Sequence, residues 1–195
     1  VSISRFFRDR KLWADLANIH IPELIHMFPK NIRVWSAGCA GGEEAFSAAM
    51  LMDDIARKGH FTCPWHILAT DTDSASLART RKENYKWGSV REVPEHLLER
   101  WFTQDGGLWV LDQELRGMVA FEEHDIVTEA PPGLFHVVFM RNCVLTYNVE
   151  KVQREVLDRI RQCLLDPGYL IIGRTEKVPD GVGFEEVSKC IYKVI

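Results

Sequence analysis

Residues 33–50 read RVWSAGCAGGEEAFSAAM and predict a strand, a glycine turn and a helix in immediate succession. Residues 32–37 have the length and apolar character of a buried strand. Glycines at positions 38, 41 and 42 allow a sharp turn and a close approach of a ligand to the backbone. The apolar positions that follow share one helical face: Ala45, Ala48, Ala49, Met52 and Ala56. This order is typical of the first crossover of a nucleotide-type α/β domain, which binds its ligand at the helix N-terminus.

Two glutamates, Glu43 and Glu44, begin this predicted helix and narrow the choice of ligand. Carboxylates are favourable near a helix N-terminus, but they repel a pyrophosphate placed there, so a ligand with an ammonium group and a ribose fits better. The dinucleotide pattern G-x-G-x-x-G would also need a glycine at Ala40, which disfavours a Rossmann dehydrogenase. The alternative is that both glutamates only cap the helix and face water.

Composition limits the class of protein. The chain has 195 residues, enough for one domain of ordinary size, and its formal net charge of −4 argues against a strongly basic nucleic-acid binder. No apolar run approaches the roughly 18 residues of a membrane-spanning helix, and the charged N-terminus at 5–11 does not resemble a signal peptide. The five cysteines form no C-x-x-C pair, and the seven histidines show no metal-ligand spacing. We therefore expect a cytoplasmic protein with reduced thiols, no metal site and no membrane insertion.

A second apolar run, residues 65–70, ends on an acid about thirty residues after the glycine turn. An acidic side chain at the end of the second strand is where such folds hold the two hydroxyls of a ribose, so we expect Asp71 to take this role. The alternative is that Asp71 is a turn or capping residue.

The rest of the chain supplies the remaining predicted elements. Residues 1–30 are expected to form a helical lead-in segment and residues 31–195 the main domain. Residues 108–111 and 118–121 are predicted to pair as a hairpin around Gly117, within a small β excursion at about 102–124. The continuous apolar run 135–140 predicts a central parallel strand that delivers Arg141 and Asn142 to the ligand-binding edge of the sheet.

Taken in order, the motifs resemble those of the CheR-type chemotaxis receptor methyltransferases. They are FFRD at 6–9, WSAGCAGGEE at 35–44, ATDTD at 69–73, MRNCVLTY at 140–147 and GRTE at 173–176. The resemblance implies a Rossmann-like, class I S-adenosylmethionine-dependent methyltransferase sheet with flanking helices and a small inserted β-hairpin subdomain. It implies an enzyme that methylates glutamate side chains of chemoreceptors. We also expect the protein to act as a monomer and, from its composition, to have no nucleic-acid partner.

The same resemblance implies a cofactor site. Its contacts would be Ser2, Ser4, Arg8, Ala37, Gly38, Glu43, Glu44, Asp71, Asp125, Ile126, Asn142 and Cys143. Asp71 would hold the ribose, Asp125 and Ile126 the adenine edge, and Asn142 and Cys143 would border the methionine part. Which glutamate of the Glu43–Glu44 pair touches the cofactor stays open.

Methyl transfer to a carboxylate requires little acid–base chemistry, because a glutamate with a pKa of about 4.3 is already ionised near neutral pH. Arg141 and Tyr147 are the candidates for orienting the acceptor carboxylate, by a charge-assisted bond and a phenolic hydrogen bond. The alternative for Arg141 is an ion pair with a neighbouring acid, and for Tyr147 a packing role.

The sequence also departs from the family pattern. Met140 and Cys143 replace a cysteine and a valine, Asn148 replaces an aromatic residue, and Thr175 replaces a serine. The loop 103–107 is short, and the family's N-terminal helical domain lies outside this sequence. Two further hypotheses therefore stay open: a methyltransferase of the same lineage with a different acceptor, and a non-catalytic S-adenosylmethionine-binding signalling module.

Overall fold

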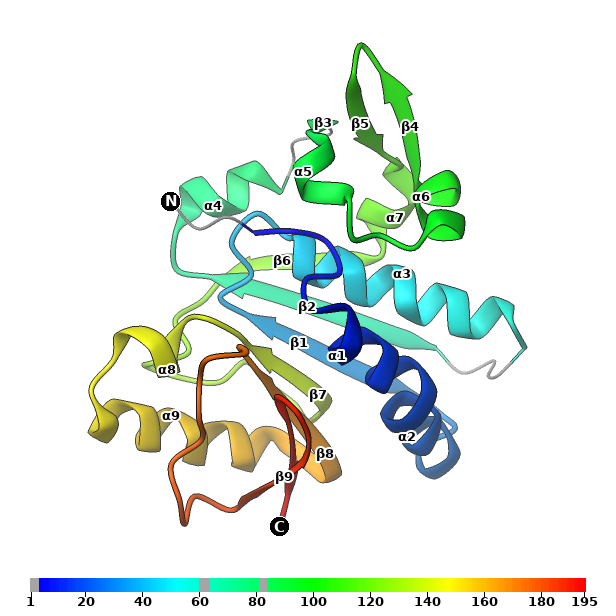
Figure 1. Ribbon diagram of the computed structural model, residues 1–195. Helices are drawn as coiled ribbons and strands as arrows, with labels where there is room; N and C mark the ends of the chain where they lie inside the picture. Colours follow the sequence, from blue (N-terminus) through cyan, green and yellow to red (C-terminus); the bar gives the residue numbers. More distant parts are fainter. Residues whose placement is uncertain (1–3, 60–63, 81–83) are drawn as a thin grey trace.

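The computed structural model describes residues 4–59, 64–80 and 84–195 and is built on a seven-stranded sheet (Figure 1). The strands lie in the order β6 (Val119–Glu123), β2 (Trp65–Asp71), β1 (Ile32–Ala37), β7 (Phe135–Met140), β8 (Leu164–Ile172), β10 (Ile191–Val194) and β9 (Phe184–Ser188). The first five strands are parallel, whereas β10 is antiparallel to both of its neighbours. This Rossmann-like arrangement confirms the predicted fold class, and the strand order reverses direction between β1 and β7, where such sheets bind ligands.

The continuous apolar sequences become the central strands because both faces of the sheet are covered. Every residue of β7 is buried. The chain moves from β1 to β2 in one direction along the sheet and from β7 to β8 in the other. Right-handed crossovers therefore place α3 (Glu43–Arg57) and α9 (Glu150–Cys163) on opposite faces. Within the described segments, every helix is too short or too polar to span a bilayer.

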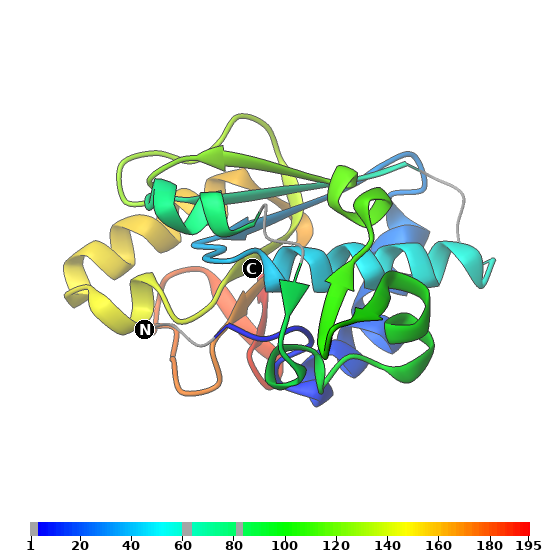
Figure 2. The same cartoon turned by 90° about the horizontal axis from the view of Figure 1, so that it is seen from above.

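The N-terminal segment packs on the same face as α3. It forms α1 (Arg10–Asp15), the π-helical turn η1 (Leu16–His20) and α2 (Ile21–Met27), which lie beside α3 in both views (Figures 1 and 2). The Phe7 N–H donates to Ser47 Oγ on α3 at 2.9 Å. The Phe6 ring meets Tyr85 and Phe102 edge-on, with centroids 4.8 and 5.2 Å apart. These contacts fix the chain just before Arg8 between α3 and the rings of Tyr85 and Phe102.

A second sheet has three strands, in the order β3 (Asn84–Tyr85), β5 (Leu108–Leu111) and β4 (Phe102–Asp105). Helix α5 (Trp87–Val90) lies in the connection between β3 and β4, and α6 (Glu95–Trp101) leads into β4 and lies beside α3 (Figure 2). In Figure 1 this small sheet stands above α3 and the beginning of β6.

The predicted hairpin of residues 108–111 with 118–121 is wrong. Strand β5 pairs instead with β4, and the later run becomes β6, which joins the main sheet in parallel beside β2. Two features explain the difference. Gly106 and Gly107 both have positive φ (54° and 80°), as a two-residue hairpin turn requires. Asp112 then caps α7 (Gln113–Gly117) by accepting from the Glu114 N–H at 2.7 Å, and this helix carries the chain back to the main sheet.

Candidate active site

The glycine turn after β1 forms one side of the candidate site. Gly38 and Gly42 have φ of 73° and 85°, the left-handed region that favours glycine. The N–H groups of Gly38 and Cys39 both donate to the Thr70 carbonyl oxygen, at 2.8 and 2.9 Å, which holds the turn against the end of β2. A Cβ at Gly38 would lie 3.1 Å from the Cys143 Cβ, so a side chain here would crowd the loop that follows β7.

Asp71, the last residue of β2, is held in one orientation by the backbone. Its two carboxylate oxygens accept from the N–H groups of Ala40 and Asp73, at 2.8 and 2.9 Å. Each oxygen of an ionised carboxylate has a further acceptor site, so a pair of hydroxyls can still bind. The His124 N–H donates to the Asp71 carbonyl oxygen at 3.1 Å, which brings the loop after β6 to the same edge of the sheet.

The loop after β6 carries the two residues expected at the adenine edge. Asp125 accepts from the Val127 N–H at 2.8 Å, and the Ile126 carbonyl oxygen accepts from Arg159 at 2.9 Å. Ile126 is buried, with an exposed fraction of 8%. The loop is thus fixed at both residues beside Asp71.

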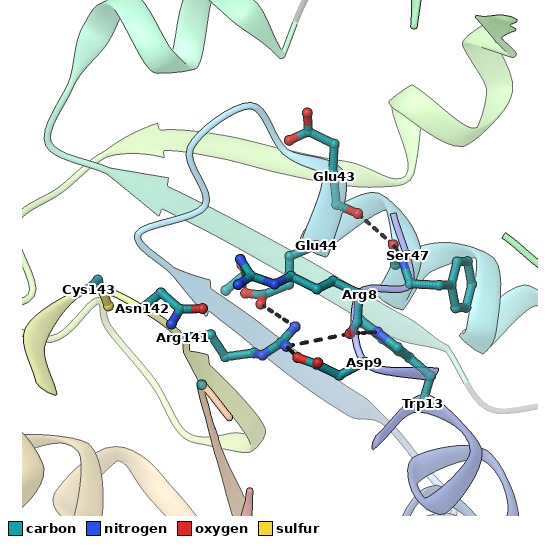
Figure 3. Close-up of polar contacts among 12 residues, drawn as sticks. Arg8, Asp9, Trp13, Glu43, Glu44, Ser47, Arg141, Asn142 and Cys143 are labelled. Carbon is teal, nitrogen blue, oxygen red and sulfur yellow. Dashed lines mark hydrogen bonds and ion pairs between the residues drawn. The ribbon is translucent and has the colours of Figure 1, made fainter. Parts of the chain in front are cut away.

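The two glutamates at the start of α3 differ in their contacts. Glu43 folds back over Gly41, and its Oε2 atom is buried without a hydrogen-bond partner among the described residues. Glu44 is already engaged, because its Oε1 accepts from the Ser36 hydroxyl at 2.8 Å and its Oε2 faces Arg141 at 3.4 Å. Figure 3 shows the two side chains pointing apart. An unpaired buried carboxylate oxygen requires a donor, so Glu43 is the member with capacity for a cationic or hydroxyl-bearing ligand.

Arg141 lies in a buried ion-pair network. This is the alternative to its predicted role in orienting the acceptor carboxylate. Its guanidinium donates to Asp9 and to the Arg8 carbonyl oxygen, the latter at 3.4 Å, and it also faces Glu44 (Figure 3). The side chain is only 5% exposed. Burial raises the pKa of Glu44, and the positive charge of Arg141 partly opposes that shift.

The Arg8 side chain is left free for the site. Its carbonyl oxygen accepts from Trp13 Nε1 at 3.0 Å, while among the described residues its guanidinium forms no ion pair and no hydrogen bond. In Figure 3 it extends across the start of α3 toward the side of Asn142. It lines a polar hollow of about 70 Å³ with Ser4, Arg5, Gly38, Cys39, Ala40, Glu44, Arg141 and Asn142. Five of the predicted cofactor contacts and Arg141 therefore meet at one place.

Glu176 is a site residue to which the sequence analysis assigned no role. Its carboxylate accepts from the N–H groups of Asn142 and Gly173, at 2.9 and 2.6 Å, and from the Thr146 hydroxyl at 2.6 Å. Asn142 has a φ of 56°, unusual for a residue other than glycine, and these bonds hold it there. The signal in the sequence is a glutamate three residues beyond a glycine that ends a buried strand at the ligand-binding edge.

The remaining candidates are placed as follows. Tyr147 ends the short helix α8 (Val144–Tyr147), and 79% of it is exposed, so its ring is not a packing residue of this chain. The Cys143 thiol donates weakly to the Ala37 carbonyl oxygen at 3.7 Å, and burial raises its pKa to about 12. Burial also raises the pKa of Cys39. Both thiols stay protonated near neutral pH, which excludes them as nucleophiles. Ser2 lies outside the described residues.

The chain is similar to several known proteins. A model of the CheR methyltransferase, SAM binding domain, matches residues 2–193. A chemotaxis protein methyltransferase of Listeria monocytogenes is 29% identical over 194 residues, which cover 98% of this chain and 72% of the relative. Chemotaxis protein methyltransferase Cher2 of Pseudomonas putida is 33% identical over 177 residues, covering 88% of this chain and 64% of the relative.

Other similar proteins are longer or more distant. An uncharacterised 104.1 kDa protein of Rhodobacter capsulatus is 30% identical over 178 residues, covering 90% of this chain and 19% of the relative. Among solved structures, the S-adenosylmethionine-bound amino pentose methyltransferase CalS10 of Micromonospora echinaspora superposes with a TM-score of 0.47 at 16% identity. That match covers 83% of this chain and 49% of the other.

Proposed function

Because this chain belongs to the CheR methyltransferase family, we propose that it transfers methyl groups from S-adenosylmethionine to glutamate side chains of chemoreceptors. One observation carries the choice of an anionic acceptor. The Arg8 guanidinium, without an ion-pair partner among the described residues, lines the hollow formed by the glycine turn and Asn142. A free, half-buried cation beside the candidate methyl donor suits a carboxylate. S-adenosylmethionine also has a carboxylate, so a test of Arg8 has to separate turnover from affinity for S-adenosylhomocysteine.

The residues present fit the cofactor. S-adenosylmethionine carries an ammonium group and a ribose, and when bound it supplies an electrophilic methyl group on a positively charged sulfur. The unpaired oxygen of Glu43 can accept from the cationic part, and Asp71 can accept from the ribose hydroxyls. Gly38 leaves the backbone open to close approach.

The chemistry needs no base. The acceptor carboxylate would take the methyl group that bound S-adenosylmethionine supplies, and the cofactor would leave as the neutral thioether S-adenosylhomocysteine. The acceptor is already ionised near neutral pH, so the protein has only to align the reacting atoms and exclude water. We assign the orienting contacts to Arg8 and Tyr147. Arg141 is a positioning residue that holds Asp9 and Glu44 and acts through them.

Replacing Asp71 with alanine is expected to weaken binding of the demethylated product, S-adenosylhomocysteine, by about 5- to 150-fold, or about 1–3 kcal/mol. The substitution removes the acceptors for the ribose and frees the Ala40 N–H. Calorimetric titration measures the dissociation constant. Asp73→Ala is the matched control, because the Asp73 side chain caps α4 (Ser74–Arg79) while its N–H, which donates to Asp71, remains in the variant. Loss of the Asp73 side chain should change the affinity less than about threefold. An equal loss in both variants would contradict the role of Asp71.

Replacing Tyr147 with phenylalanine is expected to lower kcat about 10-fold or more while leaving the affinity for S-adenosylhomocysteine unchanged. The hydroxyl is lost from an exposed ring, so the free energy of unfolding should also be unchanged. Steady-state methylation, calorimetry and urea unfolding together test this. Val149→Ala, two residues later, is the control, because it truncates an exposed side chain near the same helix and keeps the phenol. Unchanged turnover in Tyr147→Phe would remove the phenol from the reaction.

We further propose that the protein acts as a monomer in the cytoplasm. The cysteines in the described part of the chain, Cys39, Cys143, Cys163 and Cys190, are all unpaired, as is usual in a reducing compartment.

A further inference from the structure

A second hollow lies on the other side of the Asp9–Arg141 ion pair. It has a volume of about 280 Å³ and lies between the first turn of α1, the end of β8 and the turn between β9 and β10. Four of its lining side chains are cationic: Arg10, Lys11, Arg174 and Lys189. We refer to these four residues and the hollow between them as the basic groove.

The basic groove is locally positive on a chain whose net charge is −4. Its one lining acid, Asp9, already pairs with Arg141. Lys11 pairs with Asp15 on the surface, and Arg10 donates to the Arg91 carbonyl oxygen, so these two cations are held in place.

The other two cations of the groove are unpaired. Among the described residues, Arg174 and Lys189 form no ion pair and no hydrogen bond through their side chains. One further acid, Glu186, accepts from the Cys190 N–H at 3.3 Å. In the described part of the chain, the positive charges of Arg174 and Lys189 are not neutralised by a neighbouring acid, so the groove can bind a negatively charged ligand.

The groove adjoins the candidate active site across the Asp9–Arg141 ion pair, because Asp9 lines the groove and Arg141 lines the hollow that contains Arg8. Asp9 follows Arg8 directly, and Arg174 follows Gly173, whose N–H shares Glu176 with Asn142. A peptide whose glutamate meets Arg8 and Tyr147 would therefore place residues a few positions away over the groove, since an extended chain advances about 3.3–3.6 Å per residue.

We propose that the basic groove binds acidic residues that flank the methylated glutamate of the acceptor protein. This subsite rests on the proposed methylation of protein glutamates and defines the sequence context that the enzyme prefers. A peptide is favoured over a nucleic acid because the basic surface is confined to one hollow and the protein as a whole is acidic, with a pI near 6.0.

Two labelled peptides of equal length test the binding step. Each has one central glutamate, which is flanked by four aspartates in one peptide and by four asparagines in the other, so that only the central residue is a glutamate. Fluorescence anisotropy at low salt should show about 10-fold tighter binding of the acidic peptide to the unaltered chain, and high salt should reduce the preference. Arg174→Glu/Lys189→Glu should abolish the preference, and each single variant should reduce it.

Lys30→Glu is the matched control for each single variant. Lys30 is exposed and precedes β1, so it lies at the opposite edge of the sheet, and its substitution should leave the preference within about twofold. The affinity for S-adenosylhomocysteine should be unchanged in all variants. This measurement checks that the substitutions leave the cofactor site intact.

The same peptides separate this inference from the proposed function. Methyl transfer to the central glutamate should show a KM raised about 10-fold in the double variant, with kcat within about twofold. Groove-dependent binding without methylation of either peptide would leave the subsite standing and overturn the choice of acceptor. Three results would overturn the subsite. The first is equal binding of the two peptides, and the second is a loss of the preference in Lys30→Glu as large as in the groove variants. The third is displacement of the acidic peptide by a single-stranded oligonucleotide of the same charge as effectively as by the unlabelled peptide.

Discussion

Replacing Arg141 with alanine is expected to lower the free energy of unfolding by about 3–5 kcal/mol, the usual cost of removing one partner of a buried ion pair. The guanidinium is 5% exposed and contacts Asp9, Glu44 and the Arg8 carbonyl oxygen. Without it, two carboxylates remain close together with no counter-charge. Urea unfolding of the variant and the unaltered chain measures the loss.

This loss should depend on pH. Burial raises the pKa of Glu44 above its ordinary value of 4.5, so the native protein binds this proton more tightly than the unfolded chain does. The native state is therefore favoured at low pH, and Glu44 contributes progressively less stability as pH rises through its raised pKa. Removing Arg141 raises that pKa further, so the destabilisation should be smaller at about pH 5 than at about pH 7.5.

Glu44→Gln in the Arg141→Ala background serves as the control, because it removes the titrating group and should flatten this pH dependence. A loss of unfolding free energy below about 1 kcal/mol in Arg141→Ala would mean that the ion pairs of Arg141 stabilise the fold no more than an exposed ion pair does. A loss that grows toward low pH would contradict the assignment to Glu44.

Replacing Arg8 with alanine is expected to lower kcat/KM about 10- to 100-fold, the range of a hydrogen bond to a charged group. The fold uses the Arg8 carbonyl oxygen, which accepts from Trp13 and Arg141, and not its guanidinium. The substitution therefore leaves those bonds in place and removes only the cation beside the acceptor. Steady-state methylation of a chemoreceptor fragment measures the effect.

Arg8→Lys is the matched variant, because it keeps the charge but not the planar, two-pronged geometry, and it should recover part of the activity. Urea unfolding should give the same free energy for both variants and the unaltered chain. Full activity in Arg8→Ala would remove Arg8 from acceptor binding. A loss confined to S-adenosylhomocysteine affinity would return Arg8 to the cofactor contact first expected from the sequence.

The sequence predicts those parts of the fold that depend on local patterns. The strand, glycine turn and helix at 32–57 are encoded within one short stretch, and the apolar run 135–140 forms a buried strand wherever it is placed. The predicted family, fold class and cofactor are confirmed. The hairpin prediction failed because strand pairing depends on the turn at Gly106 and on the helix that Asp112 begins, and not on the apolar runs alone.

The sequence likewise predicts those parts of the candidate site that depend on local patterns. Motif order predicts that Gly38, Glu43 and Asp71 gather at one edge of the sheet, because parallel strands end there. The pairing of Arg141 with Asp9 joins positions 132 residues apart, and the bond between Asn142 and Glu176 spans 34. No local pattern encodes such contacts, since they depend on how the N-terminal segment and the end of β8 pack. The roles assigned to the site residues and the domain boundaries stay predictions.

The most direct test of the proposed function is the chemical nature of the transferred methyl group. The protein would be incubated with S-adenosylmethionine labelled in its methyl group and with cytoplasmic fragments of chemoreceptors, and the labelled product treated with mild alkali. A glutamate methyl ester releases volatile labelled methanol, and this release, strongly reduced with Arg8→Ala, is the result we predict. Label that stays on the protein after alkali, or no label on any fragment, would contradict methylation of chemoreceptor glutamates.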